Sequence, residues 1–165
     1  MTHDYVRSAT DPSSKKVVLV VPGVNSDIEM NHVTAIVKKA AKLGYHAIVV
    51  NPVVPPQQDM KNLEMVDYSQ NGTLVRSLAV TRELFGEDCE IYAVAFSLGS
   101  NHLMRHLGSH EGCHETCKIK AVVSISGAFD LPSTIVDIRK AALGLYDWYI
   151  LRKFKKMFAE HRFKC

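Results

Sequence analysis

The sequence contains few cysteines, no long apolar run and little excess charge of either sign. Four cysteines in 165 residues are too few for a disulfide-stabilised framework, so we expect a reducing, intracellular and cytoplasmic setting. No window reaches the roughly 18 apolar residues of a membrane-spanning helix. Residues 1–16 are polar and lack the apolar core of a secretory signal. The net charge of +3 is mild, so we expect no nucleic-acid partner.

The residues that are present suffice for one globular domain with a buried core. Hydrophobic residues make up 47% of the chain and charged residues 22%, which is typical of a folded domain and not of a disordered chain. Segments with the pattern of a strand alternate with segments that have the period of a helix. Strands are predicted at residues 17–21, 45–50, 91–96 and 119–125. Helices are predicted after residues 26–29, at residues 72–85 and 100–107, and through residues 133–163.

This alternation predicts an α/β fold with a mainly parallel sheet and helices on both faces. We divide the chain into a polar N-terminal extension without a strand at residues 1–16, a core at residues 17–132 and a helical segment at residues 133–165. Residues 26–29 have the spacing of a capping box, so the first helix is expected to begin there, and Gly44 is expected to end it.

The segment Ala95-Phe96-Ser97-Leu98-Gly99 joins a predicted strand to a predicted helix. A serine on such a sharp turn projects its hydroxyl out of the backbone, and its neighbours must be small because the strand and the helix nearly collide. Alanine takes the first of the two positions where glycine is usual. The segment therefore predicts a nucleophile elbow, which points to acyl-transfer chemistry. The alternative is an ordinary turn serine at a strand end.

Several stretches around this turn resemble the α/β-hydrolase superfamily. Within it the sequence is most similar to the branch of YheT-type bacterial esterases, yeast ethyl-ester synthase/esterases and animal abhydrolase-domain lipases. The matching stretches are residues 20–24, 43–51, 95–101, 121–126 and 129–131, and residues 145–162 look like the first lid helices of that branch. The resemblance implies a partial α/β-hydrolase fold with a lid-like C-terminal segment and no cofactor.

By this resemblance, Ser97 is the nucleophile of a carboxylesterase or lipase that acts on acyl esters of lipid character. The developing oxyanion needs preorganised donors, and the resemblance assigns them to the backbone N–H groups of Val24 and Leu98. The dipole of the helix that begins at Leu98 would add a favourable field.

The acid and the base that complete such a site are not identified. In this fold they follow the serine on later strands, whereas only one predicted strand follows Ser97. His102 and His106 are expected to point away from the hydroxyl and to serve surface or packing roles. Asp130 lies where some lipases place the acid, and His161 lies in the C-terminal tail. The alternative is a catalytically inactive or truncated homologue that acts as a binding or scaffold subunit, with an exposed sheet edge that favours an oligomer.

A second concentration of reactive side chains lies at residues 110–117, where His110, Cys113, His114 and Cys117 fall close together. Thiolate and imidazole bind zinc, but the spacing matches no familiar zinc knuckle, and four ligands in one short loop strain to surround one ion. We interpret this segment as a polar surface loop and expect no metal.

The C-terminal segment is amphipathic, with an apolar and aromatic face beside many basic residues. The apolar face contains Tyr146, Tyr149, Ile150, Phe154, Met157 and Phe158, and the basic residues are Arg152, Lys153, Lys155, Lys156 and Arg162. This combination is typical of a helix at a membrane surface. A lid or packing helix is the other interpretation, so we expect a contact with a membrane surface, with another protein or with the chain's own core.

Overall fold

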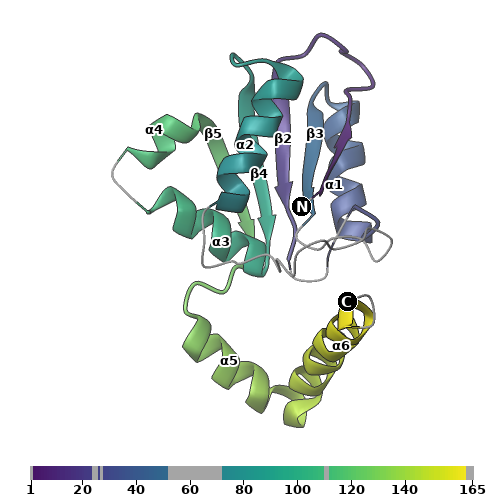
Figure 1. Ribbon diagram of the computed structural model, residues 1–165, viewed down its shortest axis with the longest axis vertical. Coiled ribbons are helices and arrows are strands. Elements are labelled where there is room, and N and C mark those ends of the chain that lie inside the picture. Colours follow the sequence, from purple (N-terminus) through teal and green to yellow (C-terminus); the bar gives the residue numbers. More distant parts are fainter. Residues whose placement is uncertain (1, 24–25, 27, 52–71, 110–111, 163–165) are drawn as a thin grey trace. The chain divides into compact units, whose positions relative to one another are not determined.

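The computed structural model describes residues 2–23, 26, 28–51, 72–109 and 112–162 (Figure 1). The chain divides into two compact units. The sheet unit comprises Met1–Val53 and Met65–Gly127, and the helical unit comprises Val54–Glu64 and Ala128–Cys165.

The sheet unit is built on five strands. Their order across the sheet is β1-β3-β2-β4-β5, with bounds Thr2–Val6 for β1, His46–Asn51 for β3, Lys16–Val21 for β2, Glu90–Phe96 for β4 and Ile119–Ile125 for β5. Strands β3, β2, β4 and β5 are mutually parallel, and β1 pairs with β3 in the antiparallel sense. The mainly parallel sheet predicted from the sequence is therefore confirmed, with the predicted strands near their expected bounds.

Strand β1 corrects the expectation that no strand precedes residue 17. Its residues pair with β3 from Thr2 opposite Asn51 to Val6 opposite Ala47. This polar segment can form a strand because its side chains have polar partners. Asn51 Nδ2 donates to Asp4 Oδ2 at 2.6 Å, and His3 Nε2 lies 2.9 Å from Ser77 Oγ. Those partners are distant in sequence, so the hydrophobic pattern gave no sign of the strand.

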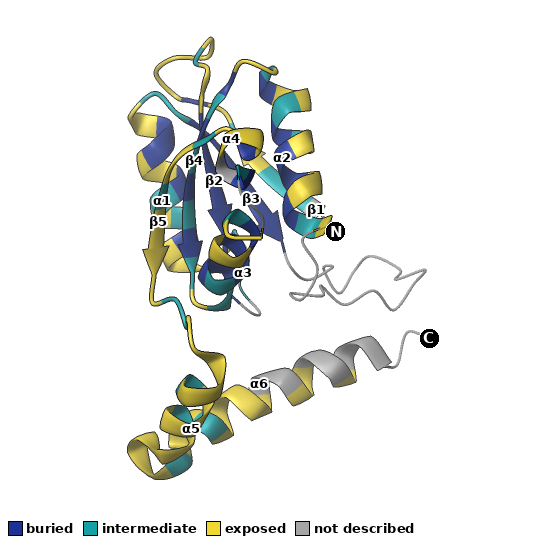
Figure 2. Cartoon of the chain, turned by 90° about the vertical axis from the view of Figure 1, so that its left-hand side faces the viewer, coloured by how far each residue is buried: buried dark blue, intermediate teal, exposed yellow. Residues whose placement is uncertain are grey.

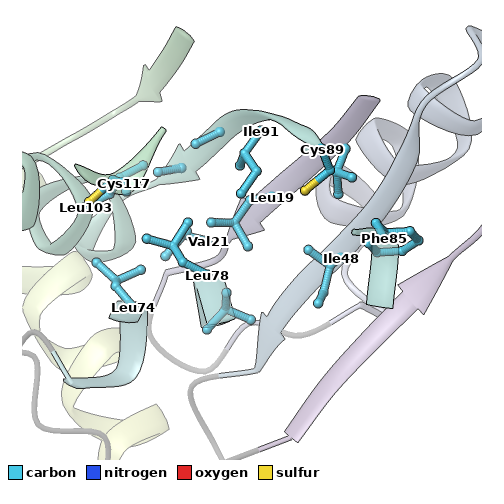
Figure 3. Close-up of a cluster of buried hydrophobic side chains, with 14 of the residues drawn as sticks. Leu19, Val21, Ile48, Leu74, Leu78, Phe85, Cys89, Ile91, Leu103 and Cys117 are labelled. Carbon is cyan, nitrogen blue, oxygen red and sulfur yellow. The ribbon is translucent and has the colours of Figure 1, made fainter. Parts of the chain in front are cut away.

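Helices cover both faces of the sheet, as predicted. Their bounds are Asn31–Lys42 for α1, Gly72–Phe85 for α2, Leu98–Leu107 for α3 and Cys113–Cys117 for α4. Alternate residues of the central strands face opposite layers, as the period of a strand requires. On one face Val18, Val20 and Val49 pack with α1. On the other face Leu19, Val21 and Ile48 pack with α2 and α3 (Figure 3).

The capping-box prediction for α1 is wrong. The helix begins at Asn31, and Met30 occupies the N-cap position in an extended conformation without a side-chain cap. Ile28 packs instead against the apolar layer beneath α1, and the hydroxyl of Thr34 donates to the Ile28 carbonyl. The chain therefore turns through this segment before the helix starts. The predicted end is confirmed, because Gly44 follows the helix with a φ of +87°.

The helical unit contains α5 (Leu131–Lys140), the 3-10 turn η1 (Ala141–Gly144) and α6 (Leu145–Arg162). Ala142 and Leu143, both with positive φ, separate the two longer helices. None of the residues described in this unit is buried, and most are coloured as exposed in Figure 2. No helix in the described part of the chain is long and apolar enough to cross a membrane.

Candidate active site

Ser97 lies at the junction of β4 and α3, in a backbone conformation that few residues other than glycine adopt. Its φ is 50° and its ψ is −124°, and the residue is exposed. This conformation directs the chain from the strand into the helix within one residue. The elbow geometry expected from the sequence is therefore present at Ser97.

Two glycines allow the end of β2 and the start of α3 to pack closely at this turn. A Cβ at Gly99 would lie 2.2 Å from the Pro22 carbonyl oxygen and 2.6 Å from that of Val21, so the first turn of α3 rests directly on the end of β2. A Cβ at Gly23 would lie 3.0 Å from Ser97 Cβ and 3.6 Å from Ser97 Oγ. The loop after β2 thus contacts the serine side chain itself.

The backbone of the turn joins two parallel strands and opens a helix. The Ser97 N–H donates to the Ile125 carbonyl at the end of β5 at 2.9 Å, and the Ser97 carbonyl accepts from Ser100 N–H at 3.0 Å. Leu98 is the first residue of α3, and N–H groups of a first helical turn have no intrahelical acceptor. Its N–H can therefore donate to a negative oxygen. Val24, the other expected donor, lies outside the described residues.

Three described histidines of the sheet unit are buried in the packed layers. His102 and His106 are 1% and 4% exposed, which agrees with the packing role expected for them. His46 Nδ1 accepts from the Ser8 N–H, and its Nε2 lies 3.0 Å from the Ser14 carbonyl. His32 was not singled out in the sequence, yet its ring makes an edge contact with Phe96, the neighbour of Ser97, at 4.8 Å between centroids. This proximity of His32 to the serine turn depends on how α1 packs against β4, so the sequence alone could not predict it.

Asp130 has a structural role within the helical unit. It is the N-cap of α5, where its carboxylate accepts from the Ser133 N–H at 3.1 Å and from the Ser133 hydroxyl at 2.6 Å. These hydrogen bonds lower the pKa of Asp130. The side chain of His161, the other residue considered for a triad, lies outside the described residues.

The segment interpreted as a polar surface loop is in part buried, which corrects that interpretation. Cys113 and Cys117 are 1% and 6% exposed and belong to the apolar layer beneath α2 and α3, where Figure 3 labels Cys117. His106 from α3 joins them, and the three ligand atoms lie within 4.8 Å of one another. Burial raises the pKa of the Cys117 thiol to about 11, and the hydrogen bond with Cys113 adds to this effect. His110 and the His114 side chain lie outside the described part.

A surface hollow exists at the opposite end of the sheet from Ser97. It is lined by residues at the amino ends of β4 and β5, including Glu90, Lys118 and Lys120. Since ligands of parallel α/β sheets bind beyond the carboxyl ends of the strands, this hollow is not part of the candidate site.

The chain is similar to a curated protein and to solved structures of esterases. No protein-family model matches the chain. "Embryogenesis-associated protein EMB8" from Picea glauca is 31% identical over 160 residues, which cover 91% of this chain and 32% of that protein. Est1E from Butyrivibrio proteoclasticus, solved with ferulic acid bound, matches with a TM-score of 0.58 at 17% identity, over 81% of this chain and 51% of its own.

An esterase from Pyrococcus furiosus matches with a TM-score of 0.53, also at 17% identity, over 96% of this chain and 61% of its own. The chain therefore spans about a third of the length of the curated relative and between half and two thirds of these two structures. At such identities the structural matches establish a shared fold.

Proposed function

We propose that this chain, which has the fold of the α/β-hydrolases, is a serine hydrolase of carboxylic esters with Ser97 as its nucleophile. One observation carries the proposal: the exposed Ser97 has φ 50° and ψ −124° between β4 and α3, with Gly23 and Gly99 packed against the turn. A backbone conformation outside the common regions is costly for serine and is enriched at active sites. On a strand-to-helix turn it is typical of a serine whose hydroxyl is presented for chemistry.

In the proposed reaction, Ser97 Oγ forms a bond to the ester carbonyl carbon and gives up its proton to a base. The carbonyl oxygen becomes an oxyanion, which the N–H groups of Leu98 and Val24 stabilise. Collapse of this intermediate breaks the bond to the alcohol, which leaves with a proton. Water then hydrolyses the acyl-serine and restores the hydroxyl. We assign the nucleophile and the oxyanion donors, and leave the base unassigned.

The proposed substrate is an acyl ester of lipid character. Supporting this choice, α6 exposes large apolar side chains next to basic ones in a chain whose fold is that of esterases and lipases. Exposed apolar residues are Tyr146, Trp148, Tyr149, Ile150 and Leu151, and exposed basic residues are Arg152, Lys155 and Lys156. A surface of this composition favours contact with a lipid aggregate or a membrane surface.

A fluorophosphonate probe tests the nucleophile, because it reacts with an activated serine and leaves a mass adduct on that residue. We expect the folded chain to be labelled at Ser97 and the S97A variant to remain unlabelled. Ser13 provides the matched control: its hydroxyl is exposed but bonded to Asp11 in a surface turn, so S13A should be labelled as the parent is. Hydrolysis of short and long p-nitrophenyl acyl esters then reports turnover and chain-length preference.

The outcomes separate the alternatives. Labelling and hydrolysis that both disappear in S97A support a hydrolase. Labelling without hydrolysis supports Ser97 as an activated hydroxyl and indicates that the chain lacks a complete set of catalytic groups. A folded chain that takes up no label at Ser97 overturns the proposal, and a non-catalytic binding or scaffold subunit then becomes the better interpretation.

A further inference from the structure

Three side chains that are distant from the proposed nucleophile form a buried group of soft ligands. His106 lies in the last turn of α3, and Cys113 and Cys117 are the first and last residues of α4. All three are less than 7% exposed, and one ligand atom from each falls within 4.8 Å of the others. Two thiols and one imidazole are ligands that zinc prefers.

Two of the three distances within the group are close to those that a tetrahedral ion imposes on its ligands, and the third is within 4.8 Å. Cys113 Sγ lies 3.6 Å from Cys117 Sγ, and Cys117 Sγ lies 3.2 Å from His106 Nε2. With bonds to zinc of about 2.3 Å for sulfur and about 2.0 Å for nitrogen, tetrahedral angles place two sulfurs about 3.8 Å apart and a sulfur and a nitrogen about 3.5 Å apart. Small adjustments of the side chains would therefore admit the ion.

The local backbone explains how the two cysteines come together. Helix α4 is a single turn enclosed by two residues in the left-handed region, Gly112 with φ 77° and Lys118 with φ 52°. Residues four apart on a helix share a face, so Cys113 and Cys117 lie one above the other. The guanidinium of Arg82, from α2, donates to the Cys117 carbonyl at 2.7 Å and fixes the end of the turn.

We propose that His106, Cys113 and Cys117 bind one zinc ion, with an external ligand or water in the fourth position. The Cys113 thiol now donates to the His106 carbonyl at 3.1 Å, so both thiols must lose their protons to solvent as zinc binds. Two thiolates then balance the charge of the ion, and the imidazole remains neutral. The ion would join the end of α3 to α4 and stabilise this corner of the sheet unit.

This inference is independent of the proposed ester hydrolysis, because it concerns binding and not turnover. The competing interpretation is a pair of ordinary packed thiols. Another is a disulfide, for which the two sulfurs would have to approach from 3.6 Å to about 2.05 Å. Neither alternative predicts that the reduced chain binds one zinc ion through these three side chains.

The test is metal binding by the whole chain, purified with a phosphine reductant and titrated with zinc or cobalt. We expect one zinc per chain by elemental analysis. Cobalt should give thiolate-to-metal charge-transfer absorption together with the visible bands of a tetrahedral ion. The variants C117S, C113S and H106Q should each lose at least about tenfold in affinity, because even the loss of a residue that only supports a metal ligand costs about 10–100-fold.

Cys89 provides the matched control, since it is a 5% exposed cysteine of the same apolar layer that does not belong to the group. The C89S variant should retain stoichiometry and spectrum. Circular dichroism of each metal-free variant verifies folding. If a variant fails to fold, the cobalt spectrum of the parent chain still shows whether thiolates bind the metal. Absence of thiolate–cobalt absorption in the parent, or zinc binding that survives both cysteine substitutions, would overturn the assignment.

Discussion

The backbone conformation of Ser97 is energetically unfavourable, so contacts with its surroundings must stabilise it. A non-glycine residue held outside the common regions of the backbone map is destabilising by on the order of 1–3 kcal/mol. Here the Ser97 N–H is bonded to Ile125, and the turn is in close contact with the end of β2. The conformation therefore depends on neighbours that are small enough to let the backbone segments meet.

Gly99 is the neighbour for which this demand is strictest. In G99A the new methyl group would overlap the carbonyl oxygens of Val21 and Pro22, which are backbone atoms that cannot rotate away. We expect a loss of at least about 2 kcal/mol in the free energy of unfolding, measured by urea denaturation. Labelling of Ser97 should fall as well, because the turn must shift.

Gly72 supplies the control for that experiment. It is the first residue of α2, and a Cβ there meets nothing within 4 Å, so G72A should change the stability by less than about 1 kcal/mol. Equal stabilities of G99A and G72A would contradict the close packing described at the elbow.

At the scale of single residues, the sequence predicted what depends on local order and missed what depends on packing. The elbow could be predicted because Ser97 and Gly99 are neighbours between a strand pattern and a helix pattern. The contact of His32 with Phe96 and the joining of His106 to two cysteines could not, because each requires segments distant in sequence to pack together. The buried position of Cys113 and Cys117 also depends on left-handed residues on both sides of α4.

The pairing of β1 with the rest of the sheet should weaken at low pH, because β1 contains His3. Burial of the His3 ring lowers its pKa below 6.5, and the positive charge of Arg76 acts in the same direction. The folded state therefore favours the neutral ring. Its contribution to stability is complete above pH 6.5 and is lost as the pH falls through the lowered pKa of the folded state.

Between pH 7 and pH 5, we expect the free energy of unfolding to fall more for the parent chain than for the H3Q variant. The difference should be less than about 1 kcal/mol, since the ring is only partly buried. Thermal unfolding at a series of pH values measures it, and hydrogen exchange of the β1 amides shows whether that strand is the part that loosens. Parallel pH profiles of the two proteins would rule out this role for His3.

The elements themselves were predictable to different degrees. Strands β2 to β5 are apolar runs of the kind that parallel sheets contain, and their pattern alone located them, although β5 is largely exposed. Strand β1 escaped prediction because it is an edge strand whose polar side chains bond to β3 and α2. The start of α1 was misplaced because tertiary packing of Ile28 prevailed over a local capping pattern.

At the scale of the whole molecule, the two edges of the sheet differ. β1 forms one edge as a polar antiparallel strand that pairs only with β3, while β5 forms the other edge as a parallel strand that pairs only with β4 among the described strands. Val123 and Ile125 of β5 are 53% and 36% exposed. Apolar residues on an unpaired edge favour association with another strand.

We therefore expect the chain to self-associate as its concentration rises. A lysine on the edge strand should weaken this association several-fold in V123K, as charged residues on natural edge strands do. The matched variant M104K places a lysine on the exposed surface of α3 and should associate like the parent. Light scattering after size exclusion measures the masses, and a parent chain that stays monomeric at every concentration would count against pairing at β5.

The hydrogen bond from Ser97 to Ile125 gives this edge a consequence for reactivity. The carbonyl that orients the peptide unit of the serine belongs to the last residue of the strand that remains open to a partner. Any strand that docks on β5 would limit the motion of that residue and, through one bond, the motion of the serine. Probe labelling of Ser97 should therefore change with the occupancy of the edge, so that association and labelling follow the same concentration curve.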